Sequence, residues 1–319
     1  MKVMILGGAG FIGSAFVREL NVKGIRPLVF DLLTYAGRLE NLMGAEYDFV
    51  KGDIKDEKLH EAIASYKPDI VVNFAAETHV DRSIYKPQEF ILTNVLGTVN
   101  VLEASRRFKF RYVHISTDEV YGEDCANEDS PLNPSSPYSA SKASADLFVK
   151  AYVRTYSVEA VIVRPSNNYG PRQFPEKFIP KAILRTLMGL HVSIYGDGRQ
   201  ERDWIYVEDT ARIIADLIEK AEWKGEVYNI PGGYRVTNLE LIKLLSEVMG
   251  KEIKVKFVSD RPGHDRRYCM TNTKLSYTTT PLKEGLRRTY EWYLKNKWWW
   301  ERLIDDDFFK LDEPWKGTE

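Results

Sequence analysis

Short apolar runs alternate with amphipathic segments along the first half of the chain. Runs rich in Val, Ile and aromatic residues predict buried strands at residues 2–6, 26–30, 47–50, 70–74, 112–115 and 158–165. Apolar residues recur at helical spacing between them, which predicts helices at residues 11–23, 55–66, 88–108 and 137–156. Strands that alternate with helices favour right-handed crossovers, so we predict an α/β fold with a doubly wound parallel sheet covered on both faces.

The pattern becomes less regular after about Pro171. Short apolar segments there are separated by "YGDGRQERDW", "PGGYRVTN" and "SDRPGHDRRY", which are rich in glycine, proline and charge. We therefore expect residues 1–170 to form the sheet domain, with some later segments returning to it, and residues 171–319 to form a smaller substrate-binding domain. The stretch "KNKWWWERLIDDDFFKLDEPWKGTE" is aromatic and acidic, and we expect it to pack on a neighbour or fray rather than take part in chemistry.

Composition narrows the class of protein. The chain has 319 residues, of which 44% are hydrophobic and 29% charged, and its net charge of −1 provides no global attraction to nucleic acid. We expect no membrane span, because no run of 18 apolar residues occurs, and the apolar N-terminus predicts a first strand rather than a secretion signal. Cys125 and Cys269 are too few for a disulfide framework and form no CxxC pair, so we expect free thiols in a reducing compartment and no metal site.

The stretch "GGAGFIG" places Gly7, Gly10 and Gly13 directly after the first predicted strand and at the start of a helix. Glycines there permit a tight turn, and the helix N-terminus offers unpaired N–H groups to a pyrophosphate, as in a Rossmann-type sheet. Asp31, at the end of the second strand, can accept from both ribose hydroxyls and repel a 2′-phosphate, which favours NAD over NADP. A plain turn glycine or a capping aspartate remains the alternative for each residue taken alone.

The stretch "PYSASKASAD" holds Tyr138 and Lys142, which lie four residues apart and so on one face of a helix. We expect the lysine ammonium, together with a nicotinamide cation, to stabilise phenolate and lower a tyrosine pKa that starts near ~10. Such a tyrosine can take the proton from a sugar hydroxyl as hydride leaves its carbon. YxxxK also occurs by chance on surface helices, but the glycine turn upstream favours the interpretation as a catalytic pair.

In "YVHISTDEVYG", Asp118 and Glu119 directly follow a predicted strand, where a parallel sheet opens onto its ligand crevice. They are either hydrated loop residues or an acid and a base. Elimination of water across two carbons needs one protonated and one ionised acid, and neighbouring acids in a dry site split their pKa values in this way. Keeping Asp118 protonated at pH 7 requires a pKa shift of ~3 units from ~3.9, about 4 kcal/mol, which we expect bound substrate to supply and an open site not to supply.

Several longer stretches carry a resemblance to a known family. They are "DLLTYAG", "FAAETHVDRSI", "STDEVYG", "SPYSASKASAD", "NNYGPRQFPEKFIP", "GDGRQERDWIYVED" and "RPGHDRRY". With GxxGxxG and YxxxK, they make roughly residues 1–300 similar to the dTDP-glucose 4,6-dehydratases of the extended short-chain dehydrogenase/reductase family. The chain departs from that family at Leu32, where lysine is usual, and in residues 123–136, a local lid that is shorter than in many members.

The resemblance implies a reaction and roles for five residues. In these lyases, NAD oxidises C4 of dTDP-glucose, a carboxylate removes the C5 proton, an acid protonates the departing C6 hydroxyl, and hydride returns to C6. The product is dTDP-4-keto-6-deoxyglucose, an intermediate of deoxysugar biosynthesis. Carried onto this chain, Tyr138 is the base for the C4 hydroxyl, supported by Lys142 and Thr117, while Glu119 is the C5 base and Asp118 the C6 acid.

The resemblance also implies two sets of binding residues. The cofactor set is Gly7, Gly10, Phe11, Ile12, Gly13, Asp31, Thr34, Asp53, Ile54, Ala75, Thr93, Tyr138, Lys142 and Asn168. The substrate set is Thr78, Asn167, Lys177, Phe178, Arg202, Arg235, Arg261, His264 and Tyr268, in which guanidinium groups suit a diphosphate. His79 is read equally well as a ligand or as a loop histidine satisfied by its neighbours.

Two other functions stay open on the sequence. A nucleotide-sugar 4-epimerase shares the glycine turn and YxxxK but usually lacks the Asp–Glu pair, and a GDP-mannose dehydratase typically keeps only the glutamate. A non-catalytic NAD-binding regulator often loses the tyrosine or the lysine, both of which are present here. The resemblance further implies a cytoplasmic homodimer built on helices 88–108 and 137–156, with no nucleic-acid or membrane partner.

Overall fold

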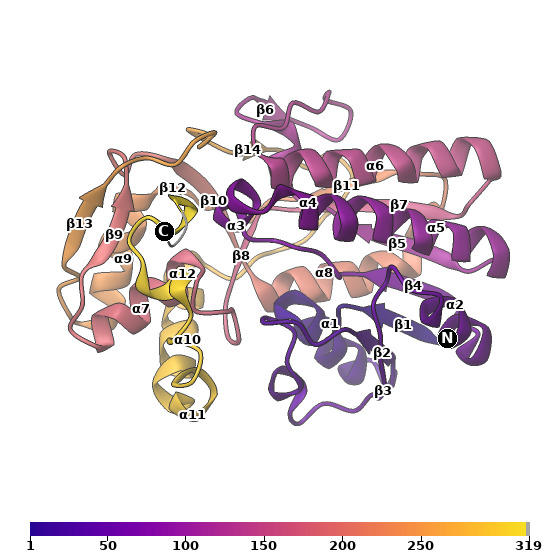
Figure 1. Ribbon diagram of the computed structural model, residues 1–319, viewed down its shortest axis with the longest axis horizontal. Coiled ribbons are helices and arrows are strands. Elements are labelled where there is room, and N and C mark those ends of the chain that lie inside the picture. Colours follow the sequence, from indigo (N-terminus) through magenta and orange to yellow (C-terminus); the bar gives the residue numbers. More distant parts are fainter. Residues whose placement is uncertain (317–319) are drawn as a thin grey trace.

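The computed structural model describes residues 1–316 and contains a large parallel sheet (Figure 1). Its strands lie in the order β11-β7-β5-β4-β1-β2-β3, and every neighbouring pair is parallel. The order reverses at β1, which pairs with β2 on one side and β4 on the other, so the predicted doubly wound α/β fold is confirmed. The strands are β1 (Val3–Leu6), β2 (Leu28–Asp31), β3 (Asp48–Lys51), β4 (Ile70–Asn73), β5 (Arg111–Ile115), β7 (Ala160–Pro165) and β11 (Val227–Ile230).

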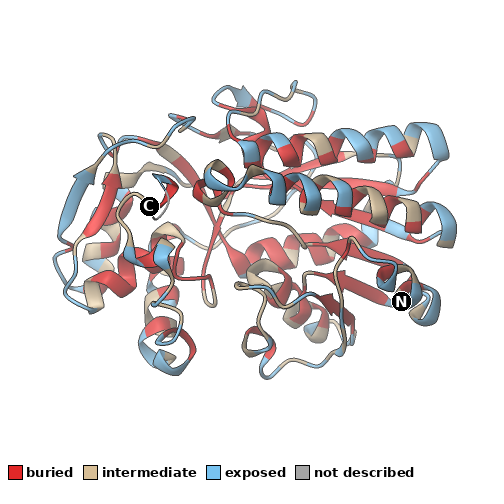
Figure 2. Cartoon of the chain, viewed as in Figure 1, coloured by how far each residue is buried: buried red, intermediate tan, exposed pale blue. Residues whose placement is uncertain are grey.

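Helices cover both faces of this sheet, and its inner strands are buried except for Arg111 at the start of β5 (Figure 2). Alternate strand residues point to opposite faces. Val3 and Ile5 pack with α1 and α8 on one face, whereas Met4 and Leu6 pack with α2, α5 and α6 on the other. These helices are α1 (Phe11–Val22), α2 (Lys58–Tyr66), α5 (Gly97–Phe108), α6 (Pro137–Tyr156) and α8 (Val207–Lys220).

The helix predicted at residues 88–108 has three parts. They are α4 (Pro87–Phe90), a six-residue π-helix η2 (Ile91–Leu96), and α5. Within η2, the buried Asn94 side chain donates to Glu77 O at 3.0 Å and to Ser141 Oγ at 2.9 Å, and it accepts from Glu77 N at 2.8 Å. Wider turns of this kind often occur at functional sites, and here the turn anchors the loop after β4.

The second half of the chain forms a smaller part with its own core, in which Tyr169, Trp204 and Tyr293 meet. It holds a three-stranded sheet, β12-β10-β8, and a separate parallel pair, β9 and β13. The chain returns to the large sheet through α8 and β11 before completing this part. Its elements are β8 (Asn167–Tyr169), α7 (Phe178–Leu187), β9 (Val192–Tyr195), β10 (Glu201–Tyr206), β12 (Arg235–Thr237), α9 (Asn238–Met249), β13 (Val255–Val258), α10 (Leu282–Lys295) and α11 (Lys297–Trp300).

Short elements lie between the two parts and at the C-terminal end. They are η1 (Leu39–Leu42), α3 (Val80–Tyr85), η3 (Asp118–Tyr121), β6 (Cys125–Ala126), β14 (Cys269–Met270), α12 (Asp307–Lys310) and η4 (Pro314–Lys316). Among residues 1–316, no helix combines the length and the apolar character that crossing a membrane requires.

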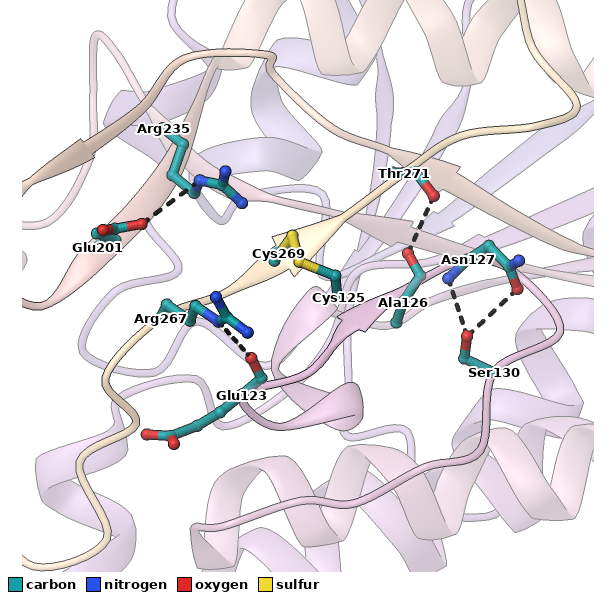
Figure 3. Close-up of a disulfide and its surroundings, with 10 residues drawn as sticks. All are labelled: Glu123, Cys125, Ala126, Asn127, Ser130, Glu201, Arg235, Arg267, Cys269 and Thr271. Atoms are coloured by element: carbon teal, nitrogen blue, oxygen red, sulfur yellow. Dashed lines mark hydrogen bonds and ion pairs between the residues drawn. A yellow bond between two sulfur atoms is a disulfide. The ribbon is translucent and has the colours of Figure 1, made fainter.

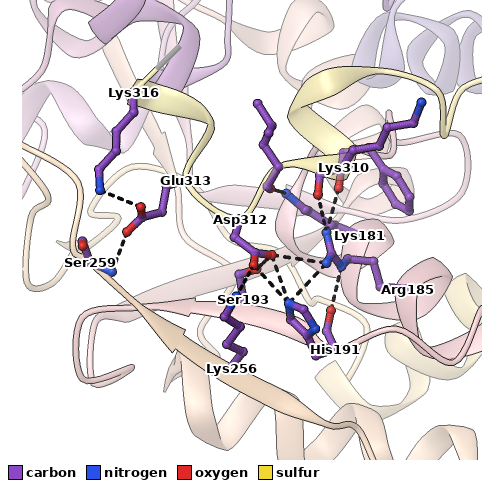
Figure 4. A network of polar contacts seen from close by, with 12 residues as sticks. Lys181, Arg185, His191, Ser193, Lys256, Ser259, Lys310, Asp312, Glu313 and Lys316 are labelled. Carbon is purple, nitrogen blue, oxygen red and sulfur yellow. Dashed lines mark hydrogen bonds and ion pairs between the residues drawn. The ribbon is translucent and has the colours of Figure 1, made fainter. Parts of the chain in front are cut away.

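The C-terminal segment packs on the smaller part of its own chain, so the expectation that it packs on a neighbour or frays is wrong for the residues described (Figure 4). Lys181 Nζ donates to the backbone oxygens of Phe308 and Leu311 at 2.7 and 2.9 Å. Asp312 accepts from Ser193 Oγ at 2.6 Å and from Lys256 Nζ at 2.8 Å. Residues 317–319 of the predicted tail lie outside the described part of the chain.

Cys125 and Cys269 form a disulfide, with their Sγ atoms 2.02 Å apart, so the prediction of two free thiols is wrong (Figure 3). The two cysteines are 144 residues apart in sequence. They meet because β6 and β14 pair in parallel, with Cys125 opposite Cys269. Spacing along the chain carries no sign of this pairing, because it depends on how the smaller part folds back onto the loop after η3.

Candidate active site

A cavity of about 570 Å³ lies between the large sheet and the smaller part. Residues at the carboxyl ends of β1, β2, β4 and β5 line one side of it, and residues of β8, β9, β10 and α7 line the other. This is the crevice at the strand ends where open α/β sheets bind ligands, and its size suits a small-molecule site.

The glycine turn lines one end of the cavity and fits a pyrophosphate. Gly7 has φ +72°, and a Cβ there would lie 2.5 Å from Ala75 N, so a larger residue would be strained and would clash. A Cβ at Gly13 would lie 2.3 Å from Gly7 O. No side chain caps α1 at Gly10, so the first N–H groups of the helix are free to meet an anion.

Asp31 lies beside this turn, at the end of β2. Its Oδ2 accepts from Ala9 N at 2.9 Å and its Oδ1 from Leu33 N at 2.8 Å, and these bonds hold the carboxyl at the cavity wall. Burial raises the pKa of Asp31, and the two backbone donors oppose that rise. The glycine turn and a fixed carboxyl at the next strand end together match the phosphate and ribose of a dinucleotide.

The other predicted cofactor residues follow the same wall. Those that line the cavity with the turn are Gly10, Phe11, Ile12, Thr34, Asp53, Ile54, Ala75, Thr93, Tyr138, Lys142 and Asn168. The structure therefore brings every residue of the predicted cofactor set to one continuous surface, although these residues come from elements far apart in sequence.

The catalytic candidates gather where β5 ends. Thr117 caps the short helix η3 by accepting from Glu119 N at 3.3 Å, and this turn carries Asp118 and Glu119 away from the strand. Thr117, Glu119, Tyr138 and Lys142 line the cavity. Asp118 does not line it and is only 2% exposed.

Lys142 is held by the backbone rather than by the phenol of Tyr138. Its Nζ donates to Ile115 O at 2.6 Å, and burial lowers its pKa to about 8, against the opposing charge of Asp146. The pKa of Tyr138 is raised by burial and by the charges of Glu119 and Asp118, and Thr117 opposes this. The lowering expected when the nicotinamide cation is also present stays a prediction, and in the protein alone Lys142 Nζ is bonded to Ile115 O.

Asp118 is already buried without substrate. Burial, Glu119 and Asp203 raise its pKa well above the usual value, and its Oδ2 has no hydrogen-bond partner. The expectation that an open site would leave Asp118 ionised is therefore wrong, because η3 places this carboxyl behind Thr117 instead of in an open mouth.

Glu119 has a different environment from Asp118. Burial raises its pKa, but Arg261, Arg202 and Lys177 all act in the opposite direction. The Tyr268 hydroxyl lies 3.2 Å from Glu119 Oε2. The nearby cations lower the pKa of Glu119, whereas the nearby acids raise the pKa of Asp118 more than Arg202 lowers it. This difference favours an ionised glutamate beside a protonated aspartic acid.

The predicted substrate residues gather at the opposite end, with one exception. Thr78, Asn167, Lys177, Phe178, Arg202, Arg261, His264 and Tyr268 line the cavity. The structure does not bring Arg235 to it, because Arg235 lies on the edge strand β12, where its half-exposed side chain is 3.5 Å from Glu201. A binding role for Arg235 therefore has no geometric support.

Comparison with known proteins gives one family over most of the chain. A family model described as GDP-mannose 4,6 dehydratase matches residues 4–280. A dTDP-glucose 4,6-dehydratase from Neisseria meningitidis is 44% identical over 96% of this chain and 97% of that protein. The chain belongs to the GDP-mannose 4,6 dehydratase family.

Solved structures related to this dehydratase family share the whole architecture. A dTDP-glucose 4,6-dehydratase from Streptomyces venezuelae, crystallised with NAD, has a TM-score of 0.88 and 42% identity, and the match covers 95% of this chain and all of that one. A UDP-glucose 4-epimerase from Thermus thermophilus, also with NAD, has a TM-score of 0.85 but 31% identity, with 93% of this chain covered and all of that one. The resemblance drawn from the motifs is confirmed, while the fold by itself does not separate dehydratases from epimerases.

Several cavity residues of this family member were missed from the sequence. Tyr195, at the end of β9, donates to Asp81 Oδ2 at 2.9 Å, and Asp81 also pairs with Arg261 at 2.9 Å. Lys181 and Asn238 line the same end. Tyr195 and Asp81 belong to the quoted stretches "YGDGRQERDW" and "FAAETHVDRSI", so a fuller reading of these stretches could have found them.

Unpartnered polar atoms surround the cavity, as expected of a site that binds a polar ligand. Buried atoms without a hydrogen-bond partner include His79 Nδ1, Ser116 Oγ, Asn167 Oδ1, Asn168 Oδ1, Gln173 Oε1 and Trp204 Nε1, all on residues that line it. Burial lowers the pKa of His79 to about 4, so its imidazole is neutral. An unpaired ring nitrogen at the wall favours a ligand contact over the loop-histidine reading.

Proposed function

We propose that the protein converts dTDP-glucose to dTDP-4-keto-6-deoxyglucose with NAD, by oxidation at C4, loss of water across C5 and C6, and return of hydride to C6. The observation that carries this proposal is the pair Asp118 and Glu119 at the end of β5. Both acids are buried, but the strongest charged neighbours of Asp118 are acids and those of Glu119 are cations. The dTDP-glucose 4,6-dehydratases among the relatives, at 42–44% identity over nearly the whole chain, support it.

The residues around the glycine turn would hold NAD. Gly7 and Gly13 permit the tight turn at the start of α1, whose N-terminal N–H groups would bind the pyrophosphate, and the Asp31 carboxylate would accept from the ribose hydroxyls. When bound, NAD would accept the hydride from C4 and later donate it to C6. Lys142 and Tyr138 line the same cavity beside the end of β5, where the reacting sugar carbon would be placed.

Tyr138 would take the proton from the C4 hydroxyl. Its phenol is buried among acids that raise its pKa, so a positive charge is needed near it before it can ionise. Lys142, fixed on Ile115 O, supplies part of that charge while it is protonated. Thr117 donates to Asp118 Oδ1 at 3.2 Å and would orient the hydroxyl end of the sugar.

Glu119 would remove the C5 proton once C4 is a ketone, because the ketone stabilises the carbanion that forms. Asp118 would then protonate the departing C6 hydroxyl, and its raised pKa and unpartnered Oδ2 suit that role. Since Asp118 lies behind the cavity wall, the role requires its side chain to turn toward the sugar when substrate is bound.

The smaller part would bind the nucleotide diphosphate. Arg202 and Arg261 can each form two hydrogen bonds with phosphate oxygens, and Asp81 holds Arg261 in place at 2.9 Å. We take residues 1–170, with α8 and β11, as the NAD-binding domain and the rest of residues 171–319 as the substrate-binding domain.

We also propose a homodimer, because η2 and α6 expose a band of large apolar side chains. Ile91, Leu92 and Leu96 on η2 and Leu147 and Phe148 on α6 are between 41% and 57% exposed. Large exposed apolar side chains on two neighbouring helices are typical of an interface, and two copies would form a four-helix bundle. Light scattering after gel filtration tests this, and a monomer at micromolar concentration would contradict it.

We propose a cytoplasmic location, where NAD and nucleotide sugars are found.

Product analysis after incubation with dTDP-glucose tests the main proposal. We expect a 4-keto-6-deoxy sugar, which absorbs in strong alkali, whereas a 4-epimerase would give dTDP-galactose, which does not. A parallel incubation with UDP-glucose measures base preference, since the thymine methyl group contributes roughly 1 kcal/mol in a fitting pocket. Protein that retains NAD but turns over neither sugar would instead indicate a regulator.

A further inference from the structure

The disulfide joins the two loops that carry the closest contacts of the proposed C5 base (Figure 3). Cys125 lies four residues after η3, the short helix that holds Glu119. Cys269 directly follows Tyr268, whose hydroxyl lies 3.2 Å from Glu119 Oε2. The disulfide therefore links the two loops on one side, and the hydrogen bond between Tyr268 and Glu119 links them on the other.

Tyr268 is a buried residue of the second loop that lines the cavity. It is 3% exposed, its hydroxyl also lies 3.0 Å from Asp265 Oδ2, and the Arg202 guanidinium lies 4.1 Å from its ring centroid. The position of this ring therefore affects both the proposed C5 base and a proposed phosphate-binding arginine.

Apart from the disulfide, this loop is held near η3 by few contacts. β6 and β14 have two residues each, and they form their own small sheet. Arg267 Nε donates to Glu123 O at 3.0 Å and Arg266 N donates to Glu123 Oε1. Thr271 N and Oγ1 donate to Ala126 O at 2.8 and 3.2 Å, and Ser135 Oγ donates to Asp265 Oδ1 at 2.5 Å. Cys125 is exposed and Cys269 half-buried, so most of these contacts lie at the edge of the molecule, where water competes with them.

We infer that Cys125 and Cys269 are positioning residues: their disulfide holds Tyr268 against Glu119, and cleaving it impairs the sugar end of the site while the fold and the NAD end persist. This inference rests on the proposed function for its kinetic consequence. The NAD end is independent because the glycine turn and Asp31 share no loop with either cysteine.

The bond is open to a dithiol because one of its cysteines is exposed. A thiolate of dithiothreitol attacks one Sγ, which breaks the S–S bond and forms a mixed disulfide. The second thiol of the reagent then displaces the cysteine, and the reagent leaves as a cyclic disulfide. Two protons from the reagent end on the two cysteine thiols, so the protein gains two electrons and two protons.

Hydrogen–deuterium exchange and steady-state kinetics on the whole protein test the inference in three forms: oxidised, reduced with dithiothreitol, and the double variant Cys125→Ser/Cys269→Ser. We expect amides of residues 260–271 and 118–126 to exchange faster in the second and third forms, with the amides of β1 and α1 unchanged. We expect kcat/KM for dTDP-glucose to fall about tenfold, since a small displacement of a positioned group has effects of this order. The double variant with dithiothreitol controls for the reagent and should not change further.

A second substitution tests whether the effect passes through Tyr268. In Tyr268→Phe, which keeps the ring and loses the hydroxyl, reduction should change kcat/KM much less than in the parent protein, because the two changes remove the same contact. If reduction lowers kcat/KM equally in the parent protein and in Tyr268→Phe, the inference is overturned. It is also overturned if reduction lowers the melting temperature but leaves kcat, KM and the exchange of the loop amides the same.

The remaining outcomes separate this inference from the proposed function. Two titratable thiols in denatured, air-purified protein would show that the disulfide does not form and would overturn the inference alone. An active enzyme that is insensitive to reduction would do the same. Protein with an intact disulfide and faster loop exchange on reduction, but no turnover of dTDP-glucose, would support the positioning role and refute the proposed function.

Discussion

The Arg82 guanidinium lies 3.9 Å from the ring centroid of Phe308, so a helix that follows β4 holds the C-terminal segment in place. The same guanidinium lies 4.2 Å from the Tyr35 ring and pairs with Glu176 at 2.8 Å and Asp306 at 2.9 Å. The ring of His79, at the cavity wall, packs edge-on against Phe308 at 5.5 Å. The last described residues are therefore coupled to the site through one arginine and one aromatic ring.

Replacing Phe308 should loosen this segment. We expect Phe308→Ala to lower the free energy of unfolding by about 1–2 kcal/mol, because it removes a cation–π contact and an aromatic contact. Urea unfolding measures this. Phe257→Ala is the matched control, since Phe257 is 55% exposed and should lose little. Equal stability of the two variants would contradict the coupling.

Removing the acid at position 118 should separate the steps of the reaction. We expect Asp118→Asn to reduce kcat by about 10²–10⁴-fold, because the C6 hydroxyl loses its proton donor, while oxidation at C4 survives. Single-turnover absorbance at 340 nm follows the first step and product formation the second. Asp124→Asn, an exposed neighbour of the site, should behave as the parent protein. If Asp118→Asn fails to oxidise the sugar at all, the assigned role is wrong.

The charge on Lys142 should set an alkaline limit to activity. Its pKa is lowered to about 8, so the ammonium is present below that pH and is lost above it, and kcat should fall as pH rises through about 8. Asp146 raises this pKa, so Asp146→Asn should move the limit to lower pH. A pH profile of kcat measures both effects. If kcat falls at the same pH in Asp146→Asn as in the parent protein, the charge on Lys142 does not set the alkaline limit.

The same variant should also be less stable. Asp146 pairs with Arg164 at 2.9 Å, and both side chains are fully buried. Asp146→Asn leaves the guanidinium without its counter-charge, which typically costs about 3–5 kcal/mol. Thermal unfolding measures this, and Asp129→Asn on the surface is the control, for which no comparable loss is expected.

The buried His114 should make stability depend on pH. Burial and the charge of Lys142 lower its pKa to about 4 from the ordinary 6.5, and its Nδ1 lies 3.0 Å from the Tyr112 hydroxyl. Between these values the unfolded chain binds a proton and the folded chain does not. This group's contribution is therefore present above pH about 6.5 and is lost as pH falls toward about 4, with a slope of up to about 1.4 kcal/mol per pH unit. His114→Gln should flatten the slope, measured as urea midpoints over this range.

The sequence predicted the larger part of the fold and site for identifiable reasons. The strands from β1 to β5 are short and apolar and the helices between them are amphipathic, so periodicity located them within a few residues. Gly7, Asp31 and Glu119 stand at strand ends, and a doubly wound sheet brings such ends together. Periodicity could not show the π-turn η2, because it arises from the hydrogen bonds of Asn94 to Glu77 and Ser141.

Other features depended on contacts that no local pattern encodes. Arg235 belongs to a charged loop like Arg202, but β12 lies at the sheet edge and leaves Arg235 outside the cavity. The pKa of Asp118 is raised without substrate, because η3 buries it fully. The tail packs on its own chain because Lys181 and Arg185 donate to its backbone carbonyls.

The sequence by itself determined the parallel sheet, the glycine turn with its partner Asp31, and the helix that places Tyr138 and Lys142 on one face, because each of these follows from spacing along a single strand or helix. Tertiary structure alone decided that Cys125 meets Cys269, that Tyr268 lies against Glu119, and that Asp118 and Glu119 differ in their surroundings. Those relationships join residues up to 149 positions apart, and they exist only once the two parts of the fold have packed together and excluded water between them.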